Sequence, residues 1–419
     1  MRLFTISSHL SSTIQILLIG LLINAVANNA YAFENTKVLP KGVRNLTIKT
    51  ANTVIDNKTN SNGQVGSLAA PLEKQVTFAD ILKEESQLKQ NQIKAMMNKE
   101  GFTESDLLGQ TFADMQGNVT VTAPIISYGI SERLTLAVAV PYYKAHMAVD
   151  IDFKATDKAQ QFLDGLGTNL TNQVASARSA GEKFNNAIAS LNEKLIDNGF
   201  QALNDWRSSG IGDITLAAKY LALDHSVLKI ASTSGVVLPT GKVDDPDNLI
   251  DIPFGDGTLD LFTSIIADQS IGAGFTINQY AKYTYQSPSF AKKRMETDEE
   301  KIEVESKTVH YKLGDKVETG SSVQFDGESG FLAGVGAIYS KKFQDKFDAT
   351  YIEVYDSINS DTAQEALHAE SRIGYSSIPA FKRKEASIPM TATLEYKSHI
   401  ASKNIPTNDL VTLDMAIFF

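Results

Sequence analysis

The chain has 419 residues and a formal net charge of −10, and this acidic balance disfavours nucleic acid as a partner. It contains no cysteine, which excludes disulfide bonds, thiolate metal sites and thiol redox chemistry. Two or more soluble domains are the default expectation at this length. The sequence contains no linker that would separate such domains.

Residues 1–32 have the pattern of a secretory signal peptide. Arg2 precedes an apolar stretch from Ile14 to Ile23, and Ala30-Tyr31-Ala32 supplies the small residues of a cleavage site. The apolar stretch has about half of the roughly 20 residues that a membrane-spanning helix needs. We therefore expect an exported protein, cleaved after Ala32, whose mature chain is residues 33–419.

The mature chain begins with a weak predicted strand, residues 41–56, and a long insertion, residues 57–116. This insertion is too long for a turn between strands. Its residues from Phe78 to Met97 follow a helix-like pattern. A clean hairpin follows at residues 118–128 and 133–143, because alternating apolar residues flank a tight turn.

A second insertion, residues 147–209, changes the apolar period from two to about 3.5. The apolar stripe runs from Leu163 to Leu195. It fits a helical segment that packs on itself or on the mouth of a barrel, and it also fits a coiled coil that binds a partner.

Period-two alternation then returns and continues to the C-terminus. The further predicted strands are residues 211–223, 227–238, 259–267, 271–286, 303–313, 317–325, 331–342, 346–356, 366–377 and 386–400. The last strand, Asp409 to Phe419, has one apolar row and one mixed face. In a closed barrel in a bilayer the apolar row faces lipid. The row that ends in Met415, Ile417 and a terminal Phe419 resembles the assembly signal of Gram-negative outer-membrane proteins.

These patterns predict an all-β transmembrane barrel of about 14 antiparallel strands. The two partly helical insertions lie on the extracellular side or in the lumen. If both ends of the chain lie in the periplasm, every second connection between strands faces the periplasm and should be short. All the connections in that set are short, including those at 314–316 and 343–345, which supports the count of fourteen. Residues 303–313 are the least regular strand, and we interpret their slipped apolar row as a bulge.

Several short motifs occur in an order that resembles the phenol-degradation (meta-pathway) family of outer-membrane transporters. They are Leu39-Pro40-Lys41-Gly42, Tyr128-Gly129-Ile130 before Glu132-Arg133-Leu134, Gly210-Ile211-Gly212-Asp213-Ile214 with Lys219-Tyr220, and Leu238-Pro239-Thr240-Gly241. The chain is also distantly similar to fatty-acid and toluene channels. Both insertions depart from the pattern. The resemblance implies uptake of small hydrophobic or aromatic molecules across the bacterial outer membrane.

Charged residues on the inner faces of the predicted strands are candidates for lining the lumen. They are Lys219, Lys282, Glu370, Arg372, Glu395 and Lys397. In the hairpin of residues 366–377 and 386–400, pairing Arg372 with Glu395 and Glu370 with Lys397 avoids placing like charges opposite one another. A purely hydrophobic solute needs a separate apolar surface, which we expect where the insertions meet the barrel mouth.

Other candidate chemistry is sparse, and we expect neither a cofactor nor an enzyme. Five aspartates between Asp244 and Asp256 have the oxygen ligands for a divalent cation, but their spacing matches no calcium loop, so a solvated acidic loop is the simpler interpretation. Lys292-Lys293-Arg294 predicts a solvated charged loop. The histidines occur in no metal or nucleophile motif.

Two functions of different kinds remain. The first is an outer-membrane channel for small hydrophobic or aromatic solutes, with outer-membrane lipid and the barrel-assembly machinery as partners. The second is a structural or adhesive barrel that presents the insertions to a partner. A conductance or solute-uptake measurement discriminates between them.

Overall fold

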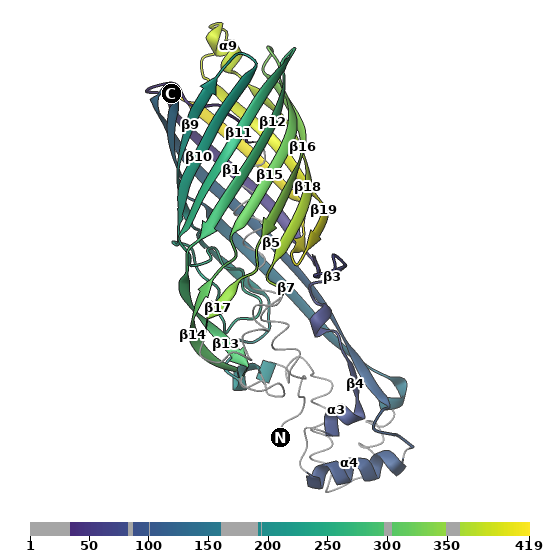
Figure 1. The fold of residues 1–419 in the computed structure, drawn as a ribbon. Helices are drawn as coiled ribbons and strands as arrows, with labels where there is room; N and C mark the ends of the chain where they lie inside the picture. Colours follow the sequence, from purple (N-terminus) through teal and green to yellow (C-terminus); the bar gives the residue numbers. More distant parts are fainter. Residues whose placement is uncertain are drawn as a thin grey trace.

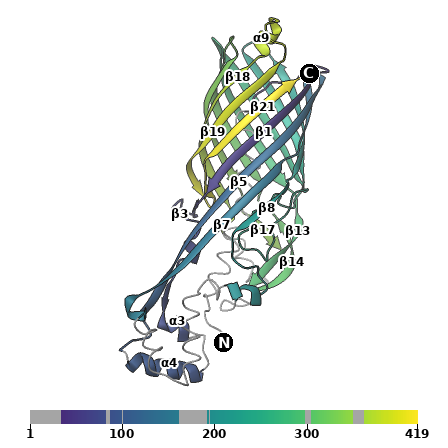
Figure 2. The same ribbon diagram turned by 180° about the vertical axis from the view of Figure 1, so that it is seen from behind.

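The computed structural model describes residues 34–82, 87–99, 101–160, 192–193, 195–296, 304–348 and 361–419. Within these ranges, twelve antiparallel strands close into a barrel, because β1 pairs with both β21 and β5. Figures 1 and 2 show the ring from opposite sides. In order around the ring, its strands are β1 (Arg44–Ile55), β21 (Leu410–Phe418), β19 (Met390–Lys403), β18 (Gln364–Ser376), β16 (Phe331–Lys342), β15 (Lys316–Asp326), β12 (Phe275–Gln286), β11 (Asp260–Gly272), β10 (Leu228–Leu238), β9 (Ile214–Asp224), β6 (Leu134–Ala139) and β5 (Leu107–Ser131).

Three further strands extend one side of the ring beyond the barrel. They are β4 (Gln75–Thr77), β7 (Tyr142–Ala155) and β8 (Trp206–Ile211). β7 continues the direction of β6 along β5, because the pairs Ile125↔Ala139 and Thr122↔Tyr142 belong to one register. The paired strands β5 and β7 project past the barrel end and reach α3 (Phe78–Leu82) and α4 (Gln87–Lys99) (Figure 1).

The expectation of fourteen barrel strands is wrong. β14 (Val304–Lys312) and β17 (Lys346–Asp348) correspond to two of the predicted barrel strands, but they lie in a separate sheet, in which β14 pairs with β17 on one side and with β13 (Ser289–Glu296) on the other. β12 then pairs directly with β15, and β16 with β18. Removing these two strands from the predicted fourteen leaves an even number of barrel strands. The alternation of short and long connections therefore did not reveal the error.

The two ends of the barrel differ in their connections. Short turns join β9 to β10 and β11 to β12 at one end, where α9 (Ile378–Lys382) also lies. Long excursions leave the other end, called here the excursion end. The connections at 314–316 and 343–345, predicted to belong to the short-turn end, lie at the excursion end instead, because they adjoin β14 and β17.

Both insertions are shorter than predicted because strand pairing continues into them. β5 starts at Leu107 within the range 57–116, and β7 and β8 occupy both ends of the range 147–209. The first insertion also contains β2 (Asn57–Thr59), β3 (Val65–Ser67) and the short helix η1 (Ala70–Leu72); β2 and β3 form a small sheet with β20 (Pro406–Thr407). Most of the stripe from Leu163 to Leu195 lies outside the described residues.

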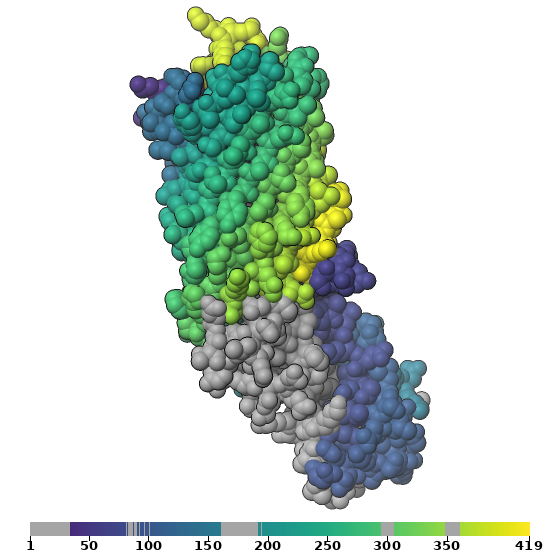
Figure 3. Space-filling view, viewed as in Figure 1, coloured from purple at the N-terminus to yellow at the C-terminus, as the bar shows by residue number. Residues whose placement is uncertain are grey.

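Alternation along the strands places apolar side chains outside and polar ones inside. On β21, Val411, Leu413, Met415 and Ile417 are each 46% exposed, whereas Thr412 is 2% exposed. Exposed Ile265, Val335 and Ile373 continue the apolar band on other strands. This distribution is the reverse of a soluble sheet and is typical of a barrel surrounded by lipid. On the face shown in Figure 3, the atoms of the barrel form a continuous surface.

One tight turn illustrates why the sequence permits this closure. β11 and β12 are joined by Ala273 and Gly274, whose φ angles are 51° and 82°. A two-residue hairpin turn with both φ angles positive matches the right-handed twist of the flanking strands. Glycine adopts such an angle without steric cost.

None of the helices in the described ranges is both long and apolar enough to cross a membrane.

Candidate functional site

A charged surface lines the inner face of the barrel along β18 and β19. Glu370, Glu395 and Lys397 are buried there, at 5%, 6% and 2% exposure. The register Arg372↔Glu395 and Glu370↔Lys397 confirms the predicted pairing of this hairpin. A bulge between Leu367 and His368 ends the regular register toward the excursion end.

Other strands complete this charged lining. Lys49 of β1 lies 3.7 Å from both Glu395 and Asp414, and the Arg372 guanidinium donates to the side-chain oxygen of Gln324 at 2.9 Å. On the neighbouring strands β12 and β15, Tyr280 donates its hydroxyl hydrogen to Glu318 at 2.9 Å. Lys49 and Glu318 are not among the predicted lining residues, although their positions in the alternating pattern of their strands indicate an inward direction.

Lys219 and Lys282, the remaining predicted lining residues, have different surroundings. The Lys282 ammonium lies 5.0 Å from the centre of the Phe262 ring, an arrangement that is favourable through the quadrupole of the ring. The Lys219 ammonium donates to the backbone oxygen of Asn35 at 2.9 Å and lies 3.8 Å from the Glu34 carboxylate. Lys219 therefore holds a segment that precedes the first strand.

That segment, residues 34–38, is called here the inner strap. Thr36 is 1% exposed, and both its backbone N–H and its hydroxyl donate to one oxygen of Asp268, at 2.8 and 2.7 Å. Asp268 also accepts from Asn278 at 2.6 Å. Near the short-turn end, Lys37 pairs with Asp326 at 2.5 Å. The inner strap is thus fixed to the inner wall by several charge-assisted contacts, which are the stronger class of hydrogen bond.

The excursion end is filled by an apolar core inside the wall, called here the mouth cluster. The connection from β10 to β11, residues 239–259, is called the mouth loop. It turns Leu249, Ile250, Ile252 and Phe254 inward, against the inner faces of β5 and β7. The other buried members are Ile55, Leu68, Ala69, Met115, Val119, Val121, Tyr143, Ala145, Met147, Ile151, Leu195, Phe200 and Leu203.

The Tyr143 and Phe254 rings stack at the centre of this core, 5.1 Å apart and inclined by 12°. Gly212 allows this arrangement, because a Cβ atom there would lie 2.3 Å from the Tyr143 ring and 2.9 Å from the Phe254 carbonyl oxygen. Asp213 then accepts the N–H of Gly241 at 2.8 Å. Gly212 and Asp213 thus position the stacked rings and the mouth loop, respectively.

Ion pairs fasten the mouth loop to β13. Lys293 lies 2.8 Å from Asp244, and Arg294 donates to Asp247 at 2.7 Å. The expectation that Lys292-Lys293-Arg294 forms a solvated loop is therefore wrong, because these residues form a strand whose charges meet the aspartates of the mouth loop. Across the described ranges, no three His, Asp or Glu side chains are grouped to hold a metal ion.

Burial also changes the pKa of one carboxyl group in the mouth loop, that of Asp251. Asp251 is 1% exposed. Its burial, together with the neighbouring charge of Asp244, raises the pKa of the Asp251 carboxyl to about 7. The Lys242 ammonium, 3.9 Å away, opposes this shift only in part.

Within the described ranges, the histidines do not form a recognisable catalytic group. His310 is in β14, outside the ring. On the inner wall, the His368 and His399 rings are 6.1 Å apart, and His399 shares a hydrogen bond of 2.8 Å with the buried Ser402 hydroxyl. A buried serine of this kind is poorly placed to attack a substrate.

Comparison with known proteins supports the fold. No protein-family model and no curated protein matches the sequence. Among solved structures, the COG4313 outer membrane channel from Pseudomonas putida F1 aligns over 92% of this chain and 99% of its own, with 12% identity and a TM-score of 0.52. A Pseudomonas aeruginosa FadL homologue aligns over 93% of both chains (7% identity, TM-score 0.34), and the Ralstonia pickettii toluene transporter TbuX over 91% and 90% (8%, 0.34). The alignment with the COG4313 channel shows that the chain has the barrel fold of that protein.

Proposed function

We propose that this protein is an outer-membrane channel for the uptake of small hydrophobic or aromatic compounds. The fold and the outward apolar band support a location in the bacterial outer membrane. The signal-peptide pattern of residues 1–32 supports the same location. The excursion end then faces the outside, because long loops of such barrels are extracellular.

The mouth cluster is the observation that carries the proposal. A charged inner wall offers little to an apolar solute, because burying a charge against an apolar group is costly. The mouth cluster places aliphatic and aromatic side chains inside the same barrel, at the end where solute enters. Binding sites for small molecules are mainly apolar with a few polar groups, and this junction has that composition.

The inner strap gives the channel a second element. It occupies the interior between Lys219, Asp268 and Asp326, so the solute path beyond the mouth depends on the position of residues 34–38. We expect passage of solute to require displacement of this strap. Its hydrogen bonds to carboxylates, not apolar contacts, set the cost of that displacement.

The test compares uptake of radiolabelled toluene by Gram-negative cells with and without the protein, because the lipopolysaccharide leaflet of the outer membrane slows apolar solutes that cross a plain phospholipid bilayer unaided. The variant Phe254→Ala removes the ring stacked on Tyr143 and should slow uptake severalfold. Phe381→Ala is the matched control, because Phe381 is an exposed phenylalanine in α9 at the opposite end. Equal uptake by cells with and without the protein would contradict the proposal.

A conductance measurement tests the inner strap separately. Deleting residues 34–38 should raise single-channel ion conductance in planar bilayers severalfold, while Asp224→Asn, at an exposed pair near the same end, should leave it unchanged. Toluene uptake at background level by a correctly folded protein would favour the adhesive alternative. In that case the projecting β5–β7 arm with α3 and α4 becomes the candidate binding surface.

A further inference from the structure

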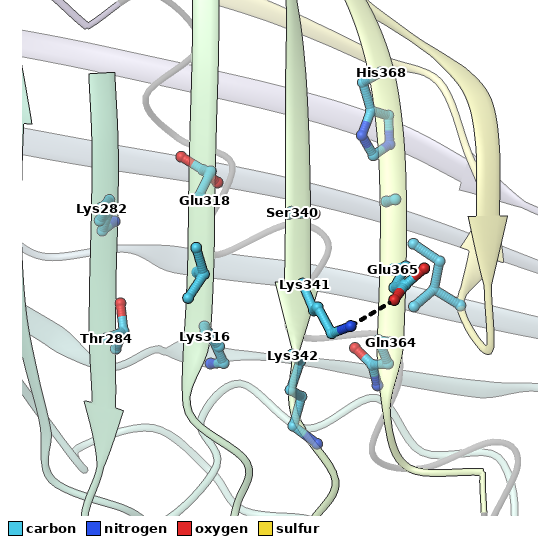
Figure 4. Close-up of a pocket in the computed structure, with 13 residues that line it drawn as sticks. Lys282, Thr284, Lys316, Glu318, Ser340, Lys341, Lys342, Gln364, Glu365 and His368 are labelled. Carbon is cyan, nitrogen blue, oxygen red and sulfur yellow. Dashed lines mark hydrogen bonds and ion pairs between the residues drawn. The ribbon is translucent and has the colours of Figure 1, made fainter.

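Two basic side chains near the excursion end lie on the outer wall of the barrel without a carboxylate partner. Elsewhere at this end, lysines are paired: beside a small cavity between β12, β15, β16 and β18, Lys341 lies 2.8 Å from Glu365 (Figure 4). Lys144 of β7 and Arg207 of β8 are exposed, and neither forms an ion pair with a carboxylate that the structure describes. Their positive charge is therefore available to an external anion.

The pairing of β7 with β8 brings these two residues together. Lys144 lies opposite Ser209, and His146 lies opposite Arg207. Lys144 and Arg207 are therefore diagonal neighbours on one face of the sheet, about 7 Å apart and within mutual reach of long side chains. This is the outward face, because the alternate residues of β7, such as Tyr143, are buried in the mouth cluster. An anion placed between the ammonium and the guanidinium accepts charge-assisted hydrogen bonds from both.

The neighbouring carboxylates have other partners or lie far away. Asp205, just before β8, lies 3.7 Å from the His146 ring and accepts the backbone N–H of Val149 at 3.2 Å. Asp150 is about 20 Å from Lys144 along the extended strand β7. At physiological ionic strength, charges are largely screened beyond about 8 Å. These acids therefore leave most of the positive charge of the pair uncompensated.

The outer surface changes from apolar to polar immediately beside this pair. On β5, the outward-facing residues change from Ile126, which is 62% exposed, to Thr122 toward the excursion end. Tyr142 of β7 pairs with Thr122 at this transition and is 41% exposed. Aromatic rings with a polar tip are typical of the boundary between the hydrocarbon layer and water. Lys144 and Arg207 thus lie just beyond that boundary, on the outer side of the membrane.

An apolar surface lies on the membrane side of the same boundary. Ile126 pairs with Val138 of β6, which is 41% exposed, and Ile211 of β8 is 50% exposed opposite Tyr142. A ligand with a phosphate at one end and acyl chains at the other is complementary to both the charged and the apolar part. Free phosphate or an acidic protein is complementary to the charged part alone. Lipid A, the phosphorylated glycolipid of the outer leaflet of a Gram-negative outer membrane, has both parts.

We propose that Lys144 and Arg207 bind a phosphate group of lipid A, whose acyl chains lie against Ile126, Val138 and Ile211. Arg207 donates two parallel hydrogen bonds to the phosphate, and the Lys144 ammonium adds a compact charge. Basic clusters at the membrane surface recognise anionic headgroups in this way. The site is on the outer wall, so it goes beyond the proposed uptake function and does not depend on which solute crosses the lumen.

Native mass spectrometry of the purified barrel in micelles tests the site with two lipids, lipid A with two phosphates and the same lipid with both phosphates removed. The wild-type protein should bind the phosphorylated lipid about tenfold or more tightly. Lys144→Gln with Arg207→Gln should lose most of this preference, and Lys144→Arg should keep it. Arg133→Gln with Lys229→Gln is the matched control, because it removes one exposed arginine and one exposed lysine at the short-turn end.

The comparison of two lipids on the wild-type protein needs no substitution, so the test stays informative if a variant folds poorly. Equal wild-type affinity for the two lipids, or equal affinity of the two double variants for phosphorylated lipid A, would overturn the proposal. Complete displacement of lipid A by millimolar inorganic phosphate would also overturn it, because the acyl chains would then contribute nothing. Toluene uptake is measured separately, so the channel function stands or falls independently.

Discussion

Arg372 of β18 lies directly opposite Glu395 of β19, inside the barrel, and Glu370 lies opposite Lys397 in the same register. Opposite charges across a strand pair contribute about 0.2–1 kcal/mol each, and like charges cost a similar amount. A shift that placed Glu370 opposite Glu395 would reverse the sign of this term. It would also require a different turn around α9.

Cysteine cross-linking tests this register in the assembled protein. Because directly opposite residues of antiparallel strands have Cα atoms about 4.5–5.5 Å apart, which disulfide geometry permits, Arg372→Cys with Glu395→Cys should oxidise efficiently. The chain contains no cysteine that would compete. Glu370→Cys with Glu395→Cys is the control and should stay reduced; the reverse result would show that the register is wrong.

Gly212→Ala should destabilise the excursion end. The added Cβ atom would lie 2.3 Å from the Tyr143 ring and 2.9 Å from a backbone oxygen, so the wall or the mouth loop must shift. Overpacking of this kind costs about 1–3 kcal/mol. Gly66→Ala is the control, because nothing lies within 4 Å of its added Cβ atom. The temperature at which heating changes the gel mobility of the folded barrel should fall for Gly212→Ala and not for Gly66→Ala.

Asp251 should make the mouth loop less stable as the pH rises. An unfolded aspartate titrates near 3.9, whereas burial raises the pKa of Asp251 in the folded loop to about 7. Between about pH 4 and pH 7 the unfolded loop has already lost the proton that the folded loop retains, so stability falls with pH across this window. Above pH 7 both forms are ionised and the loss is complete.

Fluorescence of Trp206 reports this effect, because Trp206 is the only tryptophan in the chain and packs against the mouth cluster. The urea midpoint of its emission change should be lower at pH 8 than at pH 5. Asp251→Asn should raise the pH 8 value and reduce the difference, the remainder coming from Asp213 and Asp260, whose pKa values burial raises to about 6, while Asp224→Asn should leave the difference unchanged. A midpoint independent of pH in the wild type would refute this account.

The C-terminal phenylalanine is predicted to act in assembly as well as in closure. Phe419 donates its N–H to the Arg44 carbonyl at 2.9 Å and accepts from the Arg44 N–H at 2.7 Å, so it closes the seam between β1 and β21. Deleting Phe419 should leave unfolded protein in the periplasm. Phe419→Ala keeps both backbone bonds and removes only the ring; normal assembly of this variant would assign the effect to the seam and not to an aromatic signal.

Period-two alternation determined much of the fold from the sequence alone. It located the strands that contain Met415, Tyr283 and Ile373, and the face of each that turns outward, because the side-chain direction in a strand depends only on position along it. Opposite charges on neighbouring strands also determined the register of β18 with β19. Both properties are local or involve a single hairpin.

Only the tertiary structure decided which strands belong to the ring and what fills it. β14 and β17 alternate like barrel strands, yet they pair in a separate sheet, because alternation does not specify the partner of a strand. The contacts of Thr36 with Asp268, and of Phe254 with Tyr143, join residues far apart in the chain. The juxtaposition of Lys144 and Arg207 likewise arises only once β7 and β8 pair, since no local pattern in either strand signals a shared surface.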